Sequence, residues 1–564
     1  MDTEGRHPNG KSLGSIRRVG VLACLAVALG TASAAASNHE DDPPAPWTIP
    51  AEKRFAYGVA SGEVRETSAV LWARAGRAGT AILRVASDPG FTRVVETQRI
   101  HSLARDDFTV QAVVDGLRPG RSYYFRFSMR GDRSETGRFN TPPSPRADAP
   151  VSFSFSGDAQ ATPDPFTGRP FFNDFQVFDR MTEEGNDFNV LQGDTIYSDT
   201  QVGGDVDGVE LVSPWTATSA PQKWSVYRQN LALEPMARFR GASTLYSHWD
   251  DHEFVNNFTK DDDGRALFRA GKRAFLDYTP LRGYSGKTGL YRTVRWGRNL
   301  QLFFLDQSSF RTRMAESKCR NPATGKPDPA PTLPTGVRAL YRTLVPALEW
   351  EVSDVCLNEI ARSKGRTMLG AAQFKRFIDD LDRSTATFKV VMLQEPIQHL
   401  IVNQYDRWES YAAERKRLLQ SIRRVSPENL IFLTTDMHAN FIGEVRMQTY
   451  GRGGPIPTPY TEVVTGPIAA TTHKGQLNGA VDNPNAGNLV RNNLYTAPVD
   501  PKGELGGLGL ICANIDVYSY GQVEVTSEKL IVTLKDLNGN PVLSEGSRQV
   551  PAGQPCPAVE LRAR

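Results

Sequence analysis

Residues 189–199, NVLQGDTIYSD, begin as an apolar strand and end in two carboxylates and a phenol. The apolar start is typical of a strand that is buried on both faces. Gly193 and Asp194 are turn residues, so one interpretation is a strand followed by a simple turn. The other is a metal site, because open α/β folds bind their ligands at the carboxyl ends of strands. The rest of the sequence decides between them.

Polar side chains follow five predicted strands in the same way. A single Asp at such a place is commonly the N-cap of a helix. A series of them, with a His beside two, favours a metal site instead. The candidate side chains are Asp158, Asp194 with Tyr197, the run Asp250-Asp251-His252-Glu253, the pair Gln394-Glu395, and Asp436 with His438.

The ligand types at this predicted site are mostly oxygen. Oxygen ligands suit hard cations such as calcium, magnesium, manganese or ferric iron. A phenolate ligand needs a strongly acidifying ion, because the pKa of free Tyr is about 10. Tyr197 therefore points to ferric iron, and Asp194 is the natural bridge between two ions. Two such ions can clamp a phosphoryl group and supply a hydroxide for attack on it.

Charge and cysteine content narrow the possible partners. The 564 residues include 66 Lys and Arg and 63 Asp and Glu, a formal net charge of +3. This balance gives no field to recruit nucleic acid or an anionic membrane, so no specific nucleic-acid partner is expected. Four of the five Cys lie beyond the N-terminal segment. Their order suggests the pairs Cys319–Cys356 and Cys512–Cys556, although four Cys allow three pairings.

The first 36 residues are predicted to be an export signal. The pair Arg17-Arg18 precedes a moderately apolar run and Ala-x-Ala cleavage options, which favours the twin-arginine type. An ordinary secretory signal and a lipoprotein box at Cys24 are the alternatives. The apolar run is too short for a stable membrane span. The chain is therefore expected to meet the export machinery and to be periplasmic, cell-wall associated or extracellular.

The remaining chain divides by composition. Residues 37–50 are polar and Pro-rich, which predicts a linker. Residues 51–143 carry short β-branched and aromatic runs that predict a small β-sandwich. After a Pro-rich boundary, residues 150–545 alternate apolar runs with helix-like stretches and predict an α/β domain. Residues 546–564 are expected to form a C-terminal tail.

The ordered motifs resemble a known family. The succession Gly-Asp158, Gly-Asp194-x-x-Tyr197, Asp251-His252-Glu253 and Asp436-x-His438 is similar to the calcineurin-like metallophosphoesterases. Within them, the chain resembles the PhoD-like alkaline phosphatase/phosphodiesterase family. The segments that carry this likeness are 58–62, 71–74, 123–126 and 249–257. The resemblance implies a fibronectin-III-like β-sandwich followed by a four-layer αββα metallophosphoesterase domain.

The resemblance also implies one ferric ion, Fe3+, and one or more calcium ions, Ca2+. At the matching positions, iron would take Asp158, Asp194, Tyr197 and His438. Calcium would share Asp194 and add Asp251 and Asp436, with either Gln394 or Glu395 completing its shell. The charge of Glu395 favours it over Gln394. The best-known members of the family have a Cys where this chain has Asp158.

The expected function is an exported, metal-dependent alkaline phosphatase/phosphodiesterase that hydrolyses small or polymeric phosphate mono- and diesters by a metal-bound hydroxide. His252 is expected to contact the phosphate or to protonate the leaving oxygen, and orienting Asp251 is its alternative role. Asn257 is expected to contact phosphate or metal, and otherwise to be a turn residue. The rival functions are a phospholipase-D-like diesterase and a non-catalytic, calcium-stabilised protein that binds wall polymer.

Overall fold

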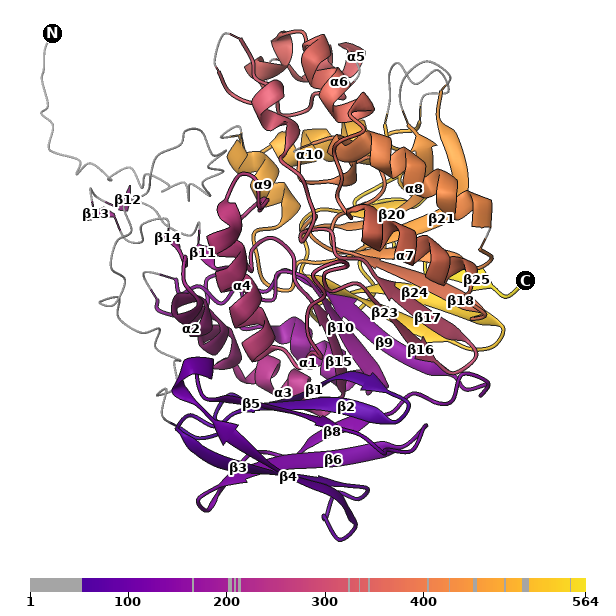
Figure 1. The fold of residues 1–564 in the computed structure, drawn as a ribbon. Coiled ribbons are helices and arrows are strands. Elements are labelled where there is room, and N and C mark those ends of the chain that lie inside the picture. The colour runs from indigo at the N-terminus through magenta and orange to yellow at the C-terminus, as the bar shows by residue number, and fades with distance from the viewer. Residues whose placement is uncertain are drawn as a thin grey trace, which may run out of the picture.

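The structure is a computed structural model of the chain. It describes residues 53–564 except for 165–166, 201–204, 207–208, 211–214, 323–324, 334, 343–344, 403–404, 426, 450–453, 481–482, 500–506 and 548. The predicted export signal and linker lie outside the described residues. Figure 1 shows two large sheets with helices on their outer faces and a smaller sheet below them.

The first large sheet has nine strands, in the order β25-β24-β23-β9-β10-β15-β1-β2-β5. Strands β9, β10 and β15 run parallel at its centre. Their carboxyl ends therefore meet at one edge of the sheet. In sheet order, the strands are β25 (Val559–Arg562), β24 (Lys529–Asp536), β23 (Ser519–Val525), β9 (Val151–Ser156), β10 (Phe188–Gln192), β15 (Thr244–His248), β1 (Val59–Arg65), β2 (Ser68–Arg74) and β5 (Thr109–Val114).

The second large sheet has seven strands and packs against the first. Strands β17, β18, β19 and β21 are parallel neighbours within it. A continuous apolar core fills the space between the two sheets, with Phe155, Val190 and Leu302 among its members. In sheet order, the strands are β16 (Arg292–Trp296), β17 (Leu300–Phe304), β18 (Phe388–Leu393), β19 (Leu430–Thr434), β21 (Ile456–Val464), β20 (Asn440–Gln448) and β22 (Cys512–Asn514).

Helices cover the outer faces of both sheets and complete four layers. The nine-stranded sheet is covered by α1 (Gln176–Glu183), α2 (Ala220–Leu231), α3 (Glu234–Ala242) and α4 (Gly264–Tyr278). The seven-stranded sheet is covered by α7 (Ala371–Asp382) and α8 (Ala412–Val425). Both helical layers have their own buried apolar clusters against the sheets. The predicted αββα architecture is confirmed.

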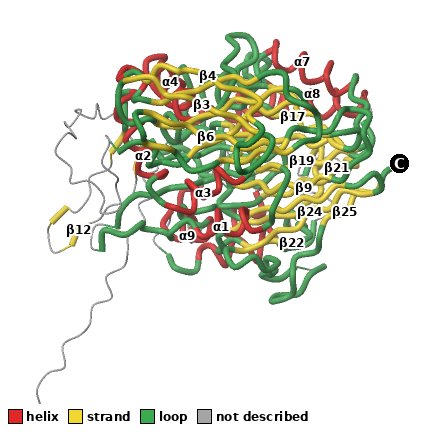
Figure 2. Tube along the Cα trace, turned by 90° about the horizontal axis from the view of Figure 1, so that it is seen from below, coloured by secondary structure: helices red, strands yellow, loops and turns green. Residues whose placement is uncertain are grey.

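The N-terminal β-region forms a sandwich, but it is not a separate body. Its outer sheet contains β4 (Val94–Ser102), β3 (Gly79–Ala86), β6 (Ser122–Met129), β7 (Asp132–Arg133) and β8 (Gly137–Asn140). Its inner sheet is β1, β2 and β5, and β1 pairs in parallel with β15 of the α/β region. This pairing covers a sheet edge that would otherwise be exposed. Figure 1 shows β3, β4 and β6 at the lower end of the molecule, and the view from below in Figure 2 shows them side by side.

The expectation of a C-terminal tail at residues 546–564 is wrong. Within it, β25 extends the nine-stranded sheet by pairing with β24. Cys556 forms a disulfide with Cys512, and Cys319 with Cys356, so both predicted disulfides are confirmed. Strand β25 has only four residues, of which Val559 and Leu561 are half-buried and Glu560 and Arg562 are exposed, so its alternation is a weak signal in the sequence.

Smaller elements decorate this frame near the carboxyl ends of the strands. The Cys319–Cys356 segment carries α5 (Thr335–Tyr341), and α6 (Asp354–Arg362) holds the second of these cysteines. After β21 come α9 (His473–Ala480), α10 (Ala486–Val490) and a π-helical turn, Arg491–Tyr495. Two short hairpins are β11 (Asp199–Thr200) with β14 (Trp215–Thr216), and β12 (Asp205–Val206) with β13 (Val209–Glu210).

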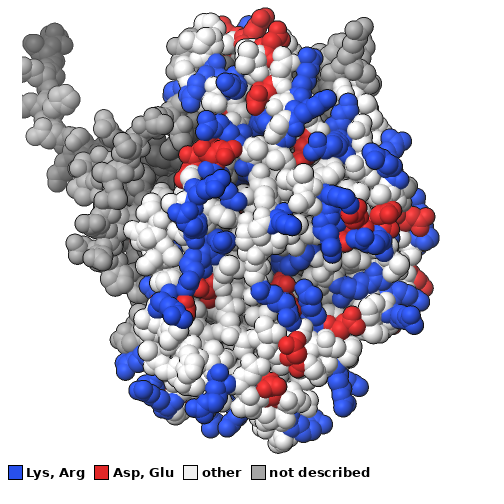
Figure 3. All heavy atoms as spheres, in the orientation of Figure 1, with Lys and Arg blue, Asp and Glu red and all other residues white. Residues whose placement is uncertain are grey.

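Among the described residues, no helix has the length and apolar character needed to cross a membrane. Lys and Arg side chains are spread over the face shown in Figure 3, while Asp and Glu form smaller groups. Many carboxylates are instead buried inside the fold, Asp158, Asp194 and Glu395 among them. Burying this many carboxylates costs free energy unless each has a partner.

Candidate metal centre

Five carboxylates stand at equivalent places, each two residues after the end of a parallel strand. Three follow β9, β10 and β15 of the first sheet, and two follow β18 and β19 of the second. Because the two sheets pack face to face, these ends converge. The five are Asp158, Asp194, Asp250, Glu395 and Asp436.

The backbone at this edge is held in a conformation that most side chains avoid. Asp158, Asp194, Asp436 and His438 have φ values of 63°, 44°, 67° and 53°. Left-handed backbone at non-Gly residues is costly and gathers at functional sites, although Asp and His tolerate it better than most. Gly193 has a φ of 96°, and a Cβ there would lie only 2.7 Å from the Cβ of Asp250. The expectation of a tight turn at this glycine is confirmed.

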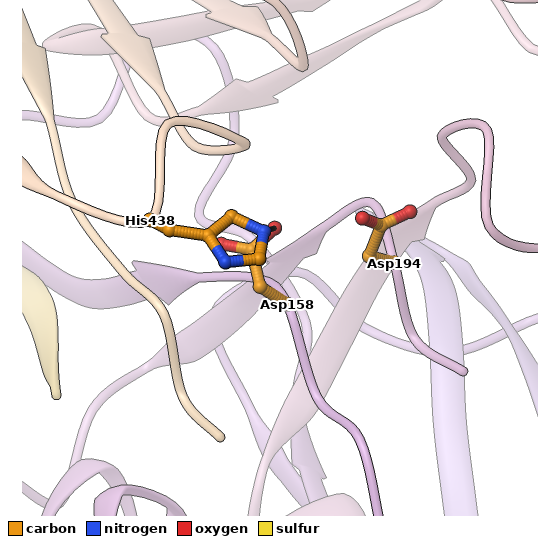
Figure 4. A group of neighbouring side chains, drawn as sticks. All are labelled: Asp158, Asp194 and His438. Atoms are coloured by element: carbon orange, nitrogen blue, oxygen red, sulfur yellow. Dashed lines mark ion pairs between the residues drawn. The ribbon is translucent and has the colours of Figure 1, made fainter. Parts of the chain in front are cut away.

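Three groups of side chains could each hold a cation. The first is Asp158, Asp194 and His438, the second is Asp194, Asp251 and His252, and the third is Asp250, Glu395 and Asp436. Within each group the ligand atoms lie within 4.8 Å of one another. Figure 4 shows the His438 ring beside Asp158, with the Asp194 carboxylate at the end of its own strand. Asp194 belongs to two groups, as its predicted bridging position requires.

Tyr197 and His438 share one proton. The Nδ1–H of His438 donates to the carbonyl of Thr471, which leaves Nε2 with a free lone pair. The Tyr197 hydroxyl lies 3.0 Å from this Nε2, so the phenol donates to it. Burial lowers the pKa of His438 to about 4 and keeps the ring neutral. Burial and the surrounding carboxylates raise the pKa of Tyr197 well above its usual value. A cation here would have to displace the shared proton to gain both ligands.

His252 is held by Asp199, a residue that lies only two positions beyond Tyr197. Its Nδ1 donates to Asp199 Oδ1 at 2.6 Å, and its ring stacks on the Tyr197 ring with centroids 4.0 Å apart. Burial disfavours protonation of His252, but the carboxylates of Asp199 and Asp251 outweigh it and raise its pKa to about 9. A protonated imidazole is a hydrogen-bond donor and not a metal ligand.

Glu395 meets a buried cation of the protein itself. Arg311 Nη1 donates to Glu395 Oε1 at 3.0 Å, and both side chains are fully buried. The guanidinium also donates to the carbonyls of Phe258 and Asp406. Glu395 Oε2 has no hydrogen-bond partner among the described residues. One carboxylate oxygen is thus fixed by Arg311, and the other remains available to a ligand.

The carboxyls of the centre repel one another. Burial, reinforced by neighbouring carboxylates, raises the pKa of Asp158, Asp194 and Asp250 well above the usual range. The same causes raise the pKa of Asp436 to about 7. Buried carboxylates that lie this close together take up protons or bind cations.

The donor set fits metal cations. Asp158 Oδ2, Asp194 Oδ2 and Asp251 Oδ1 are buried and have no hydrogen-bond partner among the described residues. Buried polar atoms are normally satisfied, so such a group of orphans needs an explanation. Hard cations would satisfy these oxygens and neutralise their charge.

Comparisons with known proteins agree with this geometry. The sequence model of the family described as PhoD-like phosphatase matches residues 166–504. The family model described as PhoD-like phosphatase, N-terminal domain, matches residues 42–143. The first match alone covers more than half of the chain. The chain belongs to the PhoD-like phosphatase family.

Similar proteins support the assignment to this family. Alkaline phosphatase D of Bacillus subtilis (strain 168) is 24% identical over 435 residues, which are 70% of this chain and 66% of that protein. The match thus spans slightly less than two thirds of the relative's length. The solved structure of PhoD superposes with a TM-score of 0.64 at 19% identity, covering 90% of this chain and 89% of that one. For purple acid phosphatase PPD1 from yellow lupin (Lupinus luteus) seeds, the TM-score is 0.50 at 10% identity, with 90% and 74% covered. These two likenesses establish the metallophosphoesterase fold.

The structure places the predicted site residues where the carboxyl ends of the two sheets converge. Asn257 is the most peripheral: its backbone N–H donates to Asp251 Oδ2, and its φ is 59°. The structure thereby shows a turn role for Asn257 and leaves its side chain without an assigned contact. Asp436 groups with Asp250 and Glu395, and not with the Asp194–Asp251 group in which calcium was expected.

The sequence interpretation named Asp250 in its candidate run but assigned it to no metal, and it missed Arg311 and the pairing of Asp199 with His252. The spacing of two residues after each strand would have favoured Asp250, because β15 ends at His248. Asp199 had a weaker signal, as a polar residue in the opening motif. Arg311 lies 84 residues from Glu395 in a loop, and nothing in the sequence pairs them.

Proposed function

We propose that this chain is an exported, metal-dependent phosphoric ester hydrolase that acts on phosphate mono- and diesters. The observation that carries the proposal is the convergence of five strand-end carboxylates, three of which (Asp158, Asp194 and Glu395) have a buried oxygen without a hydrogen-bond partner among the described residues. Family membership supports phosphate esters as the substrate class. The two disulfides support an oxidising compartment, and so an exported protein.

In this proposal, Asp158, Asp194, Tyr197 and His438 hold a ferric ion. Asp194 and Asp251 would hold one calcium ion, and Asp250, Glu395 and Asp436 would hold a second. The assignment of iron rests on the phenol, and the assignment of calcium on the excess of carboxylates. Such cations, when bound, polarise water and neutralise the negative charge of the phosphoryl oxygens.

The chain's own residues supply the remaining functions. Asp199 keeps His252 protonated through Nδ1, so the imidazolium can donate a hydrogen bond to a phosphoryl oxygen or a proton to the leaving oxygen. The stacked Tyr197 ring fixes the plane of the imidazole. Glu253 accepts the backbone N–H groups of Thr195 and Asp250, each at 2.8 Å, and ties together the two loops that carry Asp194 and Asp251.

The test is hydrolysis of p-nitrophenyl phosphate and bis-p-nitrophenyl phosphate by the mature protein purified from its export compartment. We expect release of nitrophenol that stops with a chelator and returns with Fe3+ and Ca2+. The Tyr197→Phe variant should lose the visible charge-transfer band of a ferric phenolate. Hydrolysis without any bound cation would overturn the proposal. A colourless but active protein would overturn the iron assignment alone.

A further inference from the structure

Helix α2 buries an unusual set of side chains. Its inward positions are 223, 226, 227, 230 and 231, a helical spacing that places them on one face. Three of these five are polar: Lys223, Tyr227 and Asn230. Lys223 is 0% exposed and Asn230 is 1% exposed. Burying an ammonium or an amide costs free energy unless its hydrogen bonds are replaced. Their partners therefore show what this face does.

Lys223 joins the loop after β10 to the loop after β15. Its Nζ donates to Ser198 Oγ at 2.5 Å and to the carbonyl of Phe254 at 2.8 Å. Ser198 in turn donates its N–H and its hydroxyl to the carbonyl of His252, at 3.1 and 2.8 Å. The ammonium thus closes a small network between the segment that carries Tyr197 and the segment that carries His252.

Asn230 joins the loop after β9 to the loop after β10. Its Nδ2 donates to the carbonyls of Ala159 and Thr195, at 2.8 and 3.0 Å. Its Oδ1 accepts the N–H of Ala161 at 3.2 Å. Ala159 and Thr195 directly follow two of the proposed ligands, so this one amide spans both ligand-bearing turns.

Tyr227 lies between Lys223 and Asn230 on α2 and supplies a third connection. Its hydroxyl lies 3.4 Å from Thr195 Oγ1. The Thr195 hydroxyl donates to Glu253 Oε1 at 2.7 Å, so Tyr227 is the donor in the longer contact. On the opposite side of α2, Arg228 forms an ion pair with Asp107 of the sandwich. Asp107 also pairs with Arg74 at 3.0 Å, which anchors the helix to the N-terminal sheet.

We propose that α2 is a positioning helix, in which Lys223, Tyr227 and Asn230 hold the loops after β9, β10 and β15 at the spacing that the metal cations need. This inference rests on the proposed function, because it assigns the helix a role at the same centre. None of the three side chains is a ligand. They act through the backbone of the turns that present Asp158, Asp194 and Asp251.

The experiment compares Lys223→Met and Asn230→Ala with Val226→Ala in the full mature chain. Val226 is buried on the same face of α2 and packs in the apolar cluster, so its truncation is a matched control for lost packing. Binding of Ca2+ alone is measured by calorimetry. Hydrogen exchange of segments 159–161, 194–199 and 251–257 is measured in the metal-free protein.

We expect Lys223→Met and Asn230→Ala to weaken Ca2+ binding by about 10- to 100-fold, the usual effect of removing a group that orients metal ligands. Exchange should accelerate in the loops each side chain contacts: 194–199 and 251–257 for Lys223, and 159–161 and 194–199 for Asn230. Val226→Ala should lower the melting temperature but leave Ca2+ affinity within about twofold, since it removes packing only. Unchanged loop exchange in both polar variants, or equal loss of affinity in Val226→Ala, would overturn the proposal. If the wild type bound no Ca2+, the proposed calcium site would fail, while the exchange comparison would still decide the role of α2.

Discussion

The two ends of the candidate centre balance the same kind of charge in different ways. At the first sheet, the strongest charges acting on Asp194 are other carboxylates, those of Asp251, Asp250, Glu253 and Asp158. At the second sheet, Glu395 faces carboxylates too, but the Arg311 guanidinium lies within 3.0 Å of it. Asp194 therefore depends on cations from outside, whereas Glu395 is already paired with a cation of the protein.

This difference indicates how the halves behave before metal binds. Burial and mutual repulsion raise the pKa of Asp158 and Asp194, so these two carboxyls take up protons more readily than usual in the metal-free chain. Glu395 is fixed on one oxygen by Arg311, so its other oxygen is already oriented. The carboxylates around Asp194 should therefore attract cations more strongly, whereas Glu395 is held more rigidly before a cation binds.

Replacing the shared carboxylate should have the largest effect. Asp194→Asn removes charge from two of the three groups. We expect cation content and kcat/KM for p-nitrophenyl phosphate to fall by more than the roughly 100-fold seen when an orienting partner is lost. Asp382→Asn, an exposed carboxylate at the end of α7, is the control.

The same variant should stabilise the metal-free chain, because a neutral amide relieves the repulsion that raises the pKa of the cluster. Thermal unfolding in the presence of a chelator measures this. A variant that keeps its cations and its activity, or that is less stable than the wild type with chelator, would contradict the view that Asp194 lies at the centre of the charge conflict.

Removing the buried arginine should have the next largest effect, on stability. Arg311→Met leaves the Glu395 carboxylate buried without its partner. Loss of one member of a buried pair costs about 3–5 kcal/mol. We expect saturating Ca2+ to recover part of this loss, since a cation can replace the guanidinium charge. Urea unfolding with and without Ca2+ measures it. An equal loss under both conditions would show that the second half takes no cation.

Breaking the Asp199–His252 pair should have the smallest effect, confined to alkaline pH. Asp199 raises the pKa of His252 to about 9, so Asp199→Asn should lower that pKa. The protonated donor is then lost at a lower pH, and kcat/KM should begin to fall earlier as pH rises. Acidic rates should change little. The pH profile of both proteins measures the shift; an alkaline limb that does not move would mean that His252 is not the proton-bearing group.

Sequence patterns predicted the layers and placed most of the candidate ligands at strand ends, because both follow from local rules. Apolar runs such as Phe188–Leu191 and Leu430–Leu433 become β10 and β19, and the polar residues just beyond them fall at the edge that parallel strands share.

Other features depend on contacts that no local rule contains. The pairing of β1 with β15 joins residues that are more than 180 positions apart, so the sandwich looked like a separate domain. Glu253 and Arg311 act through buried hydrogen bonds to distant loops. Their chemical type is visible in the sequence, but their partners are set by tertiary packing.

The most direct test of the central claim is the cation content of the purified mature chain, measured by elemental analysis together with phosphate ester hydrolysis on the same sample. The account predicts iron and calcium in the wild type, loss of both metal and activity with a chelator, and loss of both in Asp194→Asn. A fully active chain without bound cations, or a chain that binds them with Asp194 replaced, would contradict it.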